Sequence, residues 1–380
     1  MNCPRCLLDD SIEGVDMGLY SFVKTHEGAE YAVFEQLNPQ CNFCDLHDTL
    51  DAEYLADKLD GVLKRIKGSR KPYDCLIGIS GGCDSSYLLH KAVVSWGLKP
   101  LVVHFDNGWN TEEAEHNMSV MVDALEVDCI RYKYDINHIN RAFLMASVSD
   151  ADIPNDIAMT KLKYDTAEKY GIRYILTGHD FRTEGTVPVG WTYMDGEYIR
   201  DVTARHSLEP MGTYPNLKFW EQIIYGVKGI KQERLLYYID MPKEDKKKML
   251  HSLYGWKDYG GHHLENVYTA FIGQYVLPKK FGIDKRRVRL SGEIRSGKIT
   301  KAEALKQLED VTELDPSLRE KVRDKLGMSE VVFKVMMGKD AKTYKEFSTY
   351  RGKYRRWKWV VWVMYKVGLI PYTIYMKYTA

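Results

Sequence analysis

The stretch LIGISGGCDSSYLL, residues 76–89, decides the fold of this chain. Its first four residues form an apolar run of the kind found in buried strands, and apolar residues recur at helical spacing from Tyr87 onward. Between these segments lies SGGCDSS, residues 80–86, whose glycines permit positive φ and close approach of a ligand to the backbone. The stretch therefore predicts a strand, a glycine-rich turn and a helix N-terminus in that order.

The turn has the features of a phosphate-binding loop. The N–H groups and the dipole of a helix N-terminus favour an anion, and three serine hydroxyls add donors. Asp84 has the wrong charge to attract phosphate, so we interpret it as a magnesium ligand that bridges to the phosphates. The alternative is an ordinary turn in which Asp and Ser cap the helix. The expected phosphate contacts are Ser80, Gly81, Gly82, Ser85 and Ser86.

Strands and helices alternate after this loop. Apolar runs predict strands at 101–105, 129–132 and 174–176, with helices between them, which indicates an α/β fold with a doubly wound parallel sheet. Ligands of such sheets bind beyond the carboxyl ends of the strands. We therefore expect Asp106, Gly178 and His179 to line the nucleotide site, with turn or capping roles as the alternative for Asp106 and His179. Asp152, before a helix predicted from Lys161, is a candidate substrate contact or an ordinary helix-start residue. Residues 181–241 show no clean periodicity, which indicates irregular walls of the site.

Two CxxC pairs near the N-terminus predict a metal site. Each two-residue spacing lets both sulfurs face one ion, and four thiolates complete the tetrahedral shell that structural Zn²⁺ prefers. Free cysteines are the alternative. The insert between the pairs is long enough for a hairpin, with residues 31–34 as one strand. The ligands are Cys3, Cys6, Cys41 and Cys44.

Two later stretches carry candidate substrate-binding groups. YGGHHLE, residues 259–265, contains Tyr259, Gly260 and His262 as expected substrate contacts, and His263 or Glu265 as a base for proton transfer. LPKKFGIDKRR, residues 277–287, holds five cations interrupted by apolar residues. This pattern favours an anion site over a solvated basic surface. Its members are Lys279, Lys280, Lys285, Arg286 and Arg287, with Lys280 also a catalytic candidate.

Composition limits the class of protein. The net charge of +1 over 380 residues gives no electrostatic case for nucleic acid, and 44% hydrophobic residues can bury a sizeable core. No secretory signal or membrane-spanning apolar run is present, so we expect a cytoplasmic enzyme. The aromatic and basic tail, residues 355–378, has three open roles: a peripheral membrane contact, a partner contact, or packing on its own core.

These motifs carry a resemblance to known families. SGGCDSS resembles the pyrophosphate loop (PP-loop) of the ATP pyrophosphatases, the group that includes asparagine synthetase, GMP synthetase and tRNA thiolases. The paired CxxC motifs, SGGCDSS, TGHDFRTEG (residues 177–185), YGGHHLE and LPKKFGIDKRR occur together and in this order. The combination is similar to the N-acetyl sugar amidotransferases of the WbpG and PseA type, over residues 1 to about 310.

The resemblance implies a reaction. ATP, with Mg²⁺, adenylylates the oxygen of an N-acetyl group on a nucleotide-linked sugar, and ammonia then converts it to an acetamidino group. Such proteins serve lipopolysaccharide (LPS) O-antigen or pseudaminic and legionaminic acid synthesis. It also implies that a separate glutaminase and a barrel-shaped channel protein, resembling imidazole glycerol phosphate synthase, supply the ammonia.

The predicted organisation is consecutive along the chain. We expect a zinc-ribbon-like module at 1–50, a linking helix at 51–70, a PP-loop domain at 71–200, a substrate-binding region at 201–298 and a helical region at 299–380. The rival function is a PP-loop tRNA thiolase, disfavoured because no CxxC follows the loop and Cys129 stands alone. The oligomeric state stays open, with a homodimer as one candidate.

Overall fold

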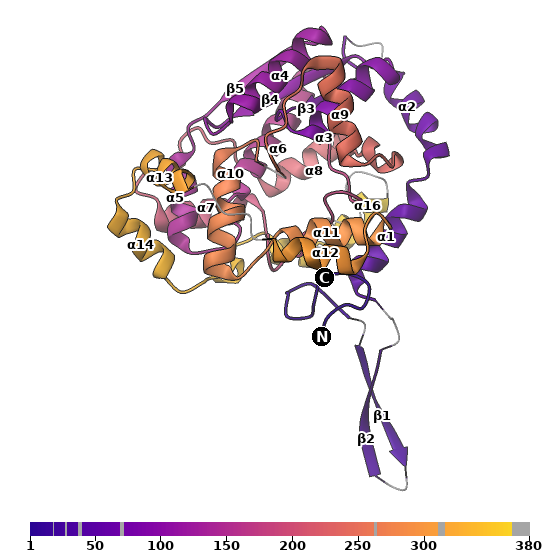
Figure 1. Ribbon diagram of the computed structural model, residues 1–380, viewed down its shortest axis with the longest axis vertical. Helices are drawn as coiled ribbons and strands as arrows, with labels where there is room; N and C mark the ends of the chain where they lie inside the picture. Colours follow the sequence, from indigo (N-terminus) through magenta and orange to yellow (C-terminus); the bar gives the residue numbers. More distant parts are fainter. Residues whose placement is uncertain are drawn as a thin grey trace. The chain divides into compact units, whose positions relative to one another are not determined.

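The computed structural model describes residues 1–17, 19–26, 29–36, 40–68, 72–261, 264–310 and 316–366 (Figure 1). The chain forms two compact units, each assembled from separate stretches. We call them the cysteine unit (residues 1–55, 180–191 and 285–312) and the sheet unit (residues 56–179, 192–284 and 313–380). The predicted organisation was consecutive, whereas each unit joins stretches that lie far apart in sequence.

A five-stranded sheet is the centre of the sheet unit. Its order is β5-β4-β3-β6-β7, and every neighbouring pair is parallel. This topology confirms the predicted α/β fold with a doubly wound parallel sheet. Four of its strands were predicted, and β7 was not. The strands are β3 (Cys75–Gly78), β4 (Pro100–Asp106), β5 (Cys129–Lys133), β6 (Tyr174–Leu176) and β7 (Lys231–Glu233).

Both faces of the central strand are covered. Ile77 and Ile79 belong to an apolar cluster with residues of α3 (Cys83–His90) and α4 (Glu112–Ala124). The intervening Gly78 faces Lys163 and Met159 of α6 (Ile153–Lys169). Successive strand residues point to opposite faces, so α3 and α4 cover one face and α6 the other. This layering explains why β3 is apolar at successive positions.

The remaining helices of the sheet unit surround this sheet (Figure 1). The stretch 181–241, which we expected to be irregular, contains α7, α8, β7 and the 3-10 helix η3 (Leu235–Tyr238), so that expectation was wrong. The helices are α2 (Leu59–Lys67), α5 (Asn137–Ala146), α7 (Gly196–His206), α8 (Phe219–Val227), α9 (Lys243–Tyr254) and α10 (Val267–Phe271). Short segments of other helix types are η1 (Ala56–Lys58), η2 (Lys91–Ser95) and the π-helical η4 (Ile272–Phe281).

The C-terminal part of the sheet unit is helical, as predicted. It contains α13 (Pro316–Lys325), α14 (Glu330–Gly338), η5 (Tyr344–Glu346), α15 (Arg351–Arg356) and α16 (Lys358–Lys366). No helix among the described residues has both the length and the apolar character needed to cross a membrane. The last residues of the aromatic tail, 367–380, lie outside the described part.

The cysteine unit combines a hairpin with three helices. β1 (Leu19–His26) and β2 (Ala29–Gln36) pair antiparallel, which confirms the hairpin expected between the CxxC pairs. The helices are α1 (Asn42–Glu53), α11 (Arg286–Arg295) and α12 (Lys301–Glu309). The capping box at Thr300 and Glu303 begins α12 as the sequence indicates. Leu7, Leu290 and Ala304 form a small apolar core of this unit.

Candidate active site

The glycine-rich loop joins β3 to α3 within the sheet unit. Gly81 has φ +76°, and a Cβ there would lie 2.3 Å from the carbonyl oxygen of Ala114 in α4. A glycine is therefore required both by conformation and by space. Gly82 is the N-cap of α3, so the helix N-terminus points its first N–H groups to the end of the loop. The predicted strand, turn and helix are confirmed.

The strand next to β3 brings a second segment to the loop. β6 runs parallel to β3, so both carboxyl ends lie at one edge of the sheet. A Cβ at Gly178 would lie 3.1 Å from the carbonyl carbon of Asp84 and 3.1 Å from the nitrogen of Ser85. The backbone after β6 therefore passes directly over the first turn of α3. The expected convergence of Gly178 on the loop is found.

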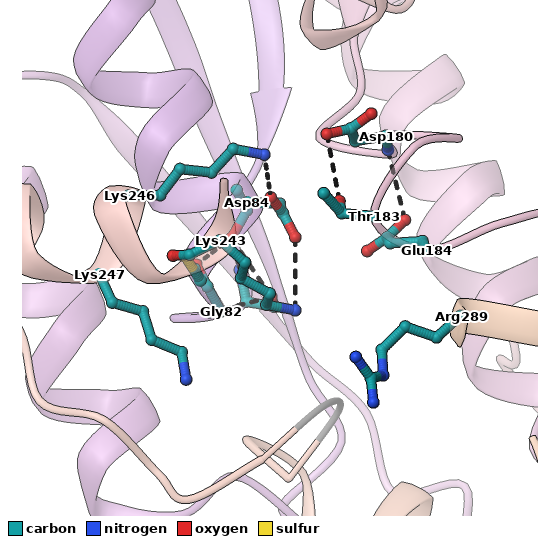
Figure 2. A network of polar contacts seen from close by, with 12 residues as sticks. Gly82, Asp84, Asp180, Thr183, Glu184, Lys243, Lys246, Lys247 and Arg289 are labelled. Atoms are coloured by element: carbon teal, nitrogen blue, oxygen red, sulfur yellow. Dashed lines mark hydrogen bonds and ion pairs between the residues drawn. The ribbon is translucent and has the colours of Figure 1, made fainter. Parts of the chain in front are cut away.

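Two lysines from a distant helix reach Asp84. Lys246 Nζ lies 2.8 Å from Asp84 Oδ1, and Lys243 Nζ lies 3.6 Å from Oδ2 (Figure 2). The Lys246 side chain is 1% exposed, and its ammonium also lies 5.5 Å from the centre of the Tyr87 ring. A buried lysine needs a compensating charge, because desolvation of an isolated ammonium is costly. Asp84 supplies that charge.

Sequence reasoning missed these lysines. They lie in PKEDKKKML, residues 242–250, where α9 begins after Pro242 with acidic residues in its first turn. A run of lysines ordinarily reads as a solvated helix face. The signal in the sequence that points to Lys246 is Leu250, an apolar residue one turn later on the same side of α9. Leu250 is fully buried.

Three residues of the region after α9, Trp256, Tyr259 and Glu265, also lie against the loop. Trp256 Nε1 donates to the carbonyl oxygen of Gly81 at 3.2 Å, and the N–H of Cys83 donates to the hydroxyl of Tyr259 at 3.1 Å. Burial, and then the charge of Glu265, raises the pKa of Tyr259, which keeps its hydroxyl protonated. Glu265 is itself close, since a Cβ at Gly82 would lie 3.1 Å from Glu265 Oε1. Tyr259 and Glu265 therefore lie at the loop, while substrate contact by Tyr259 and the base role of Glu265 stay predictions.

The loop fits a phosphate ligand. Ser86 Oγ and Thr177 Oγ1 are buried and have no hydrogen-bond partner among the described residues. Buried hydroxyls are normally paired, so such a pair beside a glycine-rich loop suits a site that is completed by a ligand. Mg²⁺ commonly takes one or two protein carboxylates together with substrate phosphates, and Asp84 is the carboxylate that would hold it here. Magnesium would neutralise negative charge on the phosphates.

Three other predicted residues have protein partners in the sheet unit. Asp106 accepts a hydrogen bond from the N–H of Gly108 at 2.8 Å, which is a turn role. The ring of His179 bonds the hydroxyl of Tyr237 at 3.0 Å. Asp152 Oδ1 accepts from Asn155 Nδ2 at 3.0 Å and from Thr269 Oγ1 at 3.2 Å. These contacts match the structural alternatives, while ligand contact by the same residues stays a prediction.

The five cations of residues 279–287 are divided between the two units, and four of them have protein partners. Lys279 and Lys280 belong to the sheet unit, whereas the other three belong to the cysteine unit. Lys280 Nζ donates to carbonyl oxygens at the end of α14, at Met336, Met337 and Lys339. Lys279 Nζ lies 4.6 Å from the centre of the Tyr275 ring. Helix ends offer unpaired carbonyls that a nearby cation satisfies, and anion binding by these residues stays a prediction.

The remaining cations of this run are bound within the cysteine unit. Arg286 donates to carbonyl oxygens at the end of α12, including that of Asp310 at 2.7 Å. Arg287 donates to the carbonyl oxygen of Leu7 and to Asp9 Oδ2, the latter at 2.8 Å. Lys285 is the N-cap residue of α11. His262 and His263 lie outside the described residues, and Gly260 has φ +88° with open space around it.

The motif TGHDFRTEG is split between the two units after His179. Its second part, from Asp180 onward, belongs to the cysteine unit and makes structural contacts there. Asp180 is fully buried and accepts from Thr183 Oγ1 at 3.1 Å, while its N–H donates to Glu184 Oε2 (Figure 2). Gly185 has φ +72°, and a Cβ there would lie 2.3 Å from the carbonyl oxygen of Val288 in α11. These residues hold the cysteine unit together rather than the loop.

The four predicted metal ligands meet in the cysteine unit. The sulfur atoms of Cys3, Cys6, Cys41 and Cys44 are all buried and lie within 4.8 Å of one another. The distance between sulfur atoms is 3.9 Å for Cys3–Cys44 and 3.7 Å for both Cys6–Cys41 and Cys41–Cys44. A tetrahedron with Zn–S bonds of about 2.3 Å has sulfur–sulfur edges of about 3.8 Å. The residues therefore fit zinc, and none of the four is in a disulfide.

A buried arginine accompanies these sulfurs. Arg295, the last residue of α11, directs Nη2 to Cys6 Sγ at 3.1 Å and Nε to Cys44 Sγ at 3.4 Å. Burial alone would lower the pKa of Arg295, but the thiolates of Cys6 and Cys44 raise it above its usual value. Four thiolates around one Zn²⁺ leave a net charge of about −2. Arg295 therefore offsets part of the charge of the proposed zinc site.

Residues 265–364 match the family model of the LPS biosynthesis protein WbpG-like, C-terminal domain. The resemblance to WbpG-type proteins is therefore confirmed. The WbpG-like segment, as we call residues 265–364, begins at Glu265 beside the loop and ends within α16. Sequence reasoning had placed the resemblance at residues 1 to about 310, so the match extends it into the C-terminal helices.

Among curated proteins no match was found. Among solved structures, the chain is similar to an NH3-dependent NAD synthetase from Campylobacter jejuni subsp. jejuni NCTC 11168 in complex with the nitrate ion. The two chains are 13% identical, the likeness covers 78% of this chain and 98% of that one, and the TM-score is 0.28. The fold assignment rests on the sheet order and the loop described above.

Proposed function

We propose that this protein is an ATP-dependent amidotransferase that converts the N-acetyl group of a nucleotide-linked sugar into an acetamidino group. The observation that carries the proposal is the loop after β3, where a helix N-terminus, two lysines and two carboxylates gather at the carboxyl edge of the sheet. The WbpG-like segment supports the substrate class, because that family is named for LPS biosynthesis. LPS is built from activated sugars.

The proposed reaction has two steps, because an amide oxygen is a poor leaving group. First, the acetyl oxygen bonds to the α-phosphorus of ATP, the bond from that phosphorus to the bridging oxygen breaks, and pyrophosphate leaves as the amide nitrogen gives up its proton. Ammonia then bonds to the activated carbon and loses a proton, and the carbon–oxygen bond to AMP breaks. The oxygen of the acetyl group leaves within AMP.

The residues at the loop suit the first step. Negative charge accumulates on the departing pyrophosphate, and the N–H groups at the start of α3 together with Lys243 and Lys246 would stabilise it. Fixed donors in a buried site need little reorganisation during the reaction. Glu265, beside Gly82, is the candidate acceptor for the proton that ammonia loses, with His263 as the alternative base.

Ammonia is proposed to come from a separate glutaminase through a barrel-type channel protein. Outside the zinc cluster the chain has Cys75, Cys83 and Cys129. Burial raises the pKa of all three thiols, and that of Cys83 reaches about 12. A nucleophilic cysteine needs the opposite shift, toward thiolate. The same property weighs against the rival function, a PP-loop tRNA thiolase, since sulfur transfer also uses reactive cysteines.

Product analysis tests the proposal directly. The purified chain is incubated with ATP, magnesium, an ammonium salt and a panel of UDP- and CMP-linked N-acetyl sugars. We expect AMP and pyrophosphate in equal amounts, and a sugar product in which NH has replaced one oxygen, resolved by high-resolution mass spectrometry. ATP cleavage that depends on added tRNA rather than on a sugar nucleotide would overturn the proposal in favour of the thiolase.

The nitrogen source is tested separately. With ammonium the rate should rise with pH, because only unprotonated ammonia attacks. With glutamine alone the chain should be inactive until a glutaminase and channel protein are added. Robust turnover with glutamine and no added protein would contradict the separate glutaminase.

The two lysines of α9 are tested with matched variants. Lys246→Met keeps the volume of the buried side chain and removes its charge, and we expect a loss in kcat of about 10² to 10³. Lys248→Met on the same helix, whose side chain is 79% exposed, is the control and should retain activity. Equal activity of both variants would show that Lys246 is only structural.

A further inference from the structure

The sheet unit exposes an aromatic surface on its C-terminal helices. On α16, Trp359, Trp362 and Val363 are spaced i, i+3 and i+4, so they lie on one face, and all three are exposed. Trp359 is 67% exposed. Val361, on the opposite side of the helix, is buried. α16 thus packs through one side and turns tryptophans to the solvent on the other.

A second helix extends this surface. On α8, Trp220, Ile224 and Val227 are spaced i, i+4 and i+7 and are likewise exposed, with Val227 at 81%. The rings of Trp220 and Trp357 lie 6.3 Å apart, centre to centre, and so connect α8 to the segment between α15 and α16. We call this the tryptophan surface: Trp220, Ile224, Val227, Trp357, Trp359, Trp362 and Val363. Contiguous exposed apolar residues of this kind mark interaction sites.

The charge around the tryptophan surface is strongly positive. Residues 347–380 contain seven of the 54 Lys and Arg residues and no Asp or Glu, so this stretch carries +7. The preceding 346 residues, with 47 cations against 53 acidic residues, carry −6. Lys366 lies at the end of the exposed face, with its ammonium 5.7 Å from the centre of the Trp362 ring. The stretch that carries Trp357, Trp359 and Trp362 is therefore basic, whereas the rest of the chain has a net negative charge.

We propose that the tryptophan surface docks on an anionic phospholipid membrane, with α8 and α16 lying in the headgroup region. Tryptophan is favoured at the boundary between headgroups and acyl chains, and lysine and arginine are attracted to anionic lipids. A protein partner fits less well, because lysine is depleted in protein–protein interfaces and three lysines border this surface. Those lysines are Lys353, Lys358 and Lys366, all exposed.

Vesicle binding by the full chain tests the proposal. Vesicles of phosphatidylcholine alone are compared with vesicles that also contain phosphatidylglycerol, at low and high salt. We expect the protein to sediment with the anionic vesicles only, and less so at high salt. The tryptophan emission should shift to shorter wavelength on binding, as indole rings leave water.

Variants assign the binding to this surface. Trp359→Ser combined with Trp362→Ser should abolish both sedimentation and the emission shift, whereas Val331→Ser, an exposed apolar position on α14, should leave them unchanged. Lys358→Gln combined with Lys366→Gln should weaken binding about thirtyfold, at roughly fivefold for each cation near the surface. Lys334→Gln is the charge control, because the Lys334 side chain lies on α14 and is 75% exposed.

Other results would contradict docking of the tryptophan surface on a membrane. Absence of binding to the anionic vesicles would overturn the proposal, as would binding that the tryptophan variant leaves intact. In another case the protein binds no vesicles, and the tryptophan variant changes the sedimentation coefficient of the free protein. This result would identify the surface as a contact between copies of the chain. Neither outcome depends on the proposed amidotransferase reaction.

Discussion

The cysteine cluster and the glycine-rich loop both bury a negative group against a cation, but they differ in the site that each builds. Four thiolates gather negative charge in the cysteine unit, and Arg295 is buried against two of them. The loop gathers positive potential at a helix N-terminus, and Asp84 is buried there against Lys246 and Lys243. In both places a cation from far along the chain balances a buried negative group: Lys246 lies against Asp84, and Arg295 lies against Cys6 and Cys44.

The two sites differ in what completes them. The sulfur geometry of the cluster fits a closed tetrahedral shell with no position left for a substrate, so its role is stability. The loop keeps buried hydroxyls at Ser86 and Thr177 without partners among the described residues, which suits a ligand that comes and goes. Changes at the loop should therefore affect turnover, and changes at the cluster should affect metal content and folding.

Asp84→Asn should give the largest effect on activity. The change keeps the shape of the side chain but removes the carboxylate that faces Lys246 and that we assign to magnesium. We expect pyrophosphate release to fall by about 10³ or more, measured with a coupled pyrophosphate assay. The cysteine unit should keep its zinc. AMP formation at a near-normal rate would show that the assignment of Asp84 is wrong.

Cys6→Ser should give the largest effect on stability. The loss of one thiolate opens the tetrahedral shell, and because zinc binding is folding free energy, several kcal/mol of stability of the cysteine unit should be lost with it. Zinc per chain, measured by elemental analysis, should fall from one toward zero. Cys129→Ser, outside the cluster, is the control and should keep its zinc. Pure unaltered protein that holds iron, or no metal, would sink the zinc assignment.

Arg295→Met should act in the same direction but less strongly. The variant keeps much of the side-chain volume and removes the charge beside Cys6 and Cys44. We expect zinc affinity to drop about 10- to 100-fold in a chelator competition, as is typical when a group that supports metal ligands is lost. Arg289→Met, on the same helix but paired with Glu293, should leave the affinity unchanged. An unchanged affinity in Arg295→Met would show that this arginine only packs.

Gly178→Ala should give the smallest effect. Its new Cβ would lie 3.1 Å from the backbone of Asp84 and Ser85, so the first turn of α3 must shift by a few tenths of an ångström. We expect kcat to fall about tenfold, because small displacements of positioned groups slow a reaction. Gly338→Ala meets no atom within 4 Å and is the control. Thermal unfolding should show little change in either variant.

Local signals in the sequence were reliable where a structure depends on neighbouring residues. Residues 76–89 form the strand, loop and helix that their apolar pattern and glycines indicate, and the capping box at Thr300 begins a helix. α6 begins at Ile153, earlier than expected, because Pro154 occupies the first turn, where its missing N–H costs nothing. Signals of this kind act within a few residues, so no knowledge of the tertiary fold is needed.

The hydrophobic pattern of the sequence did not predict a helix whose apolar side is exposed. α8 lies in the stretch that we expected to be irregular, and its Trp220, Ile224 and Val227 are exposed. Buried apolar residues therefore do not trace a clean stripe along it. The protein partners of Lys280 and Arg286 could not be predicted for another reason, since they are carbonyl groups at helix ends, which no side-chain pattern reveals.

The sequence by itself determined the parallel α/β sheet, the phosphate-type loop and the four cysteines of the metal site, because period, glycine conformation and ligand spacing are local properties. Only the tertiary structure decided which charge is buried against which. In the run KEDKKK every lysine looks equally solvated, yet Lys246 is 1% exposed against Asp84 and Lys248 is in solvent. Burial of an ion depends on a partner brought from elsewhere in the chain, and that partner is chosen by packing.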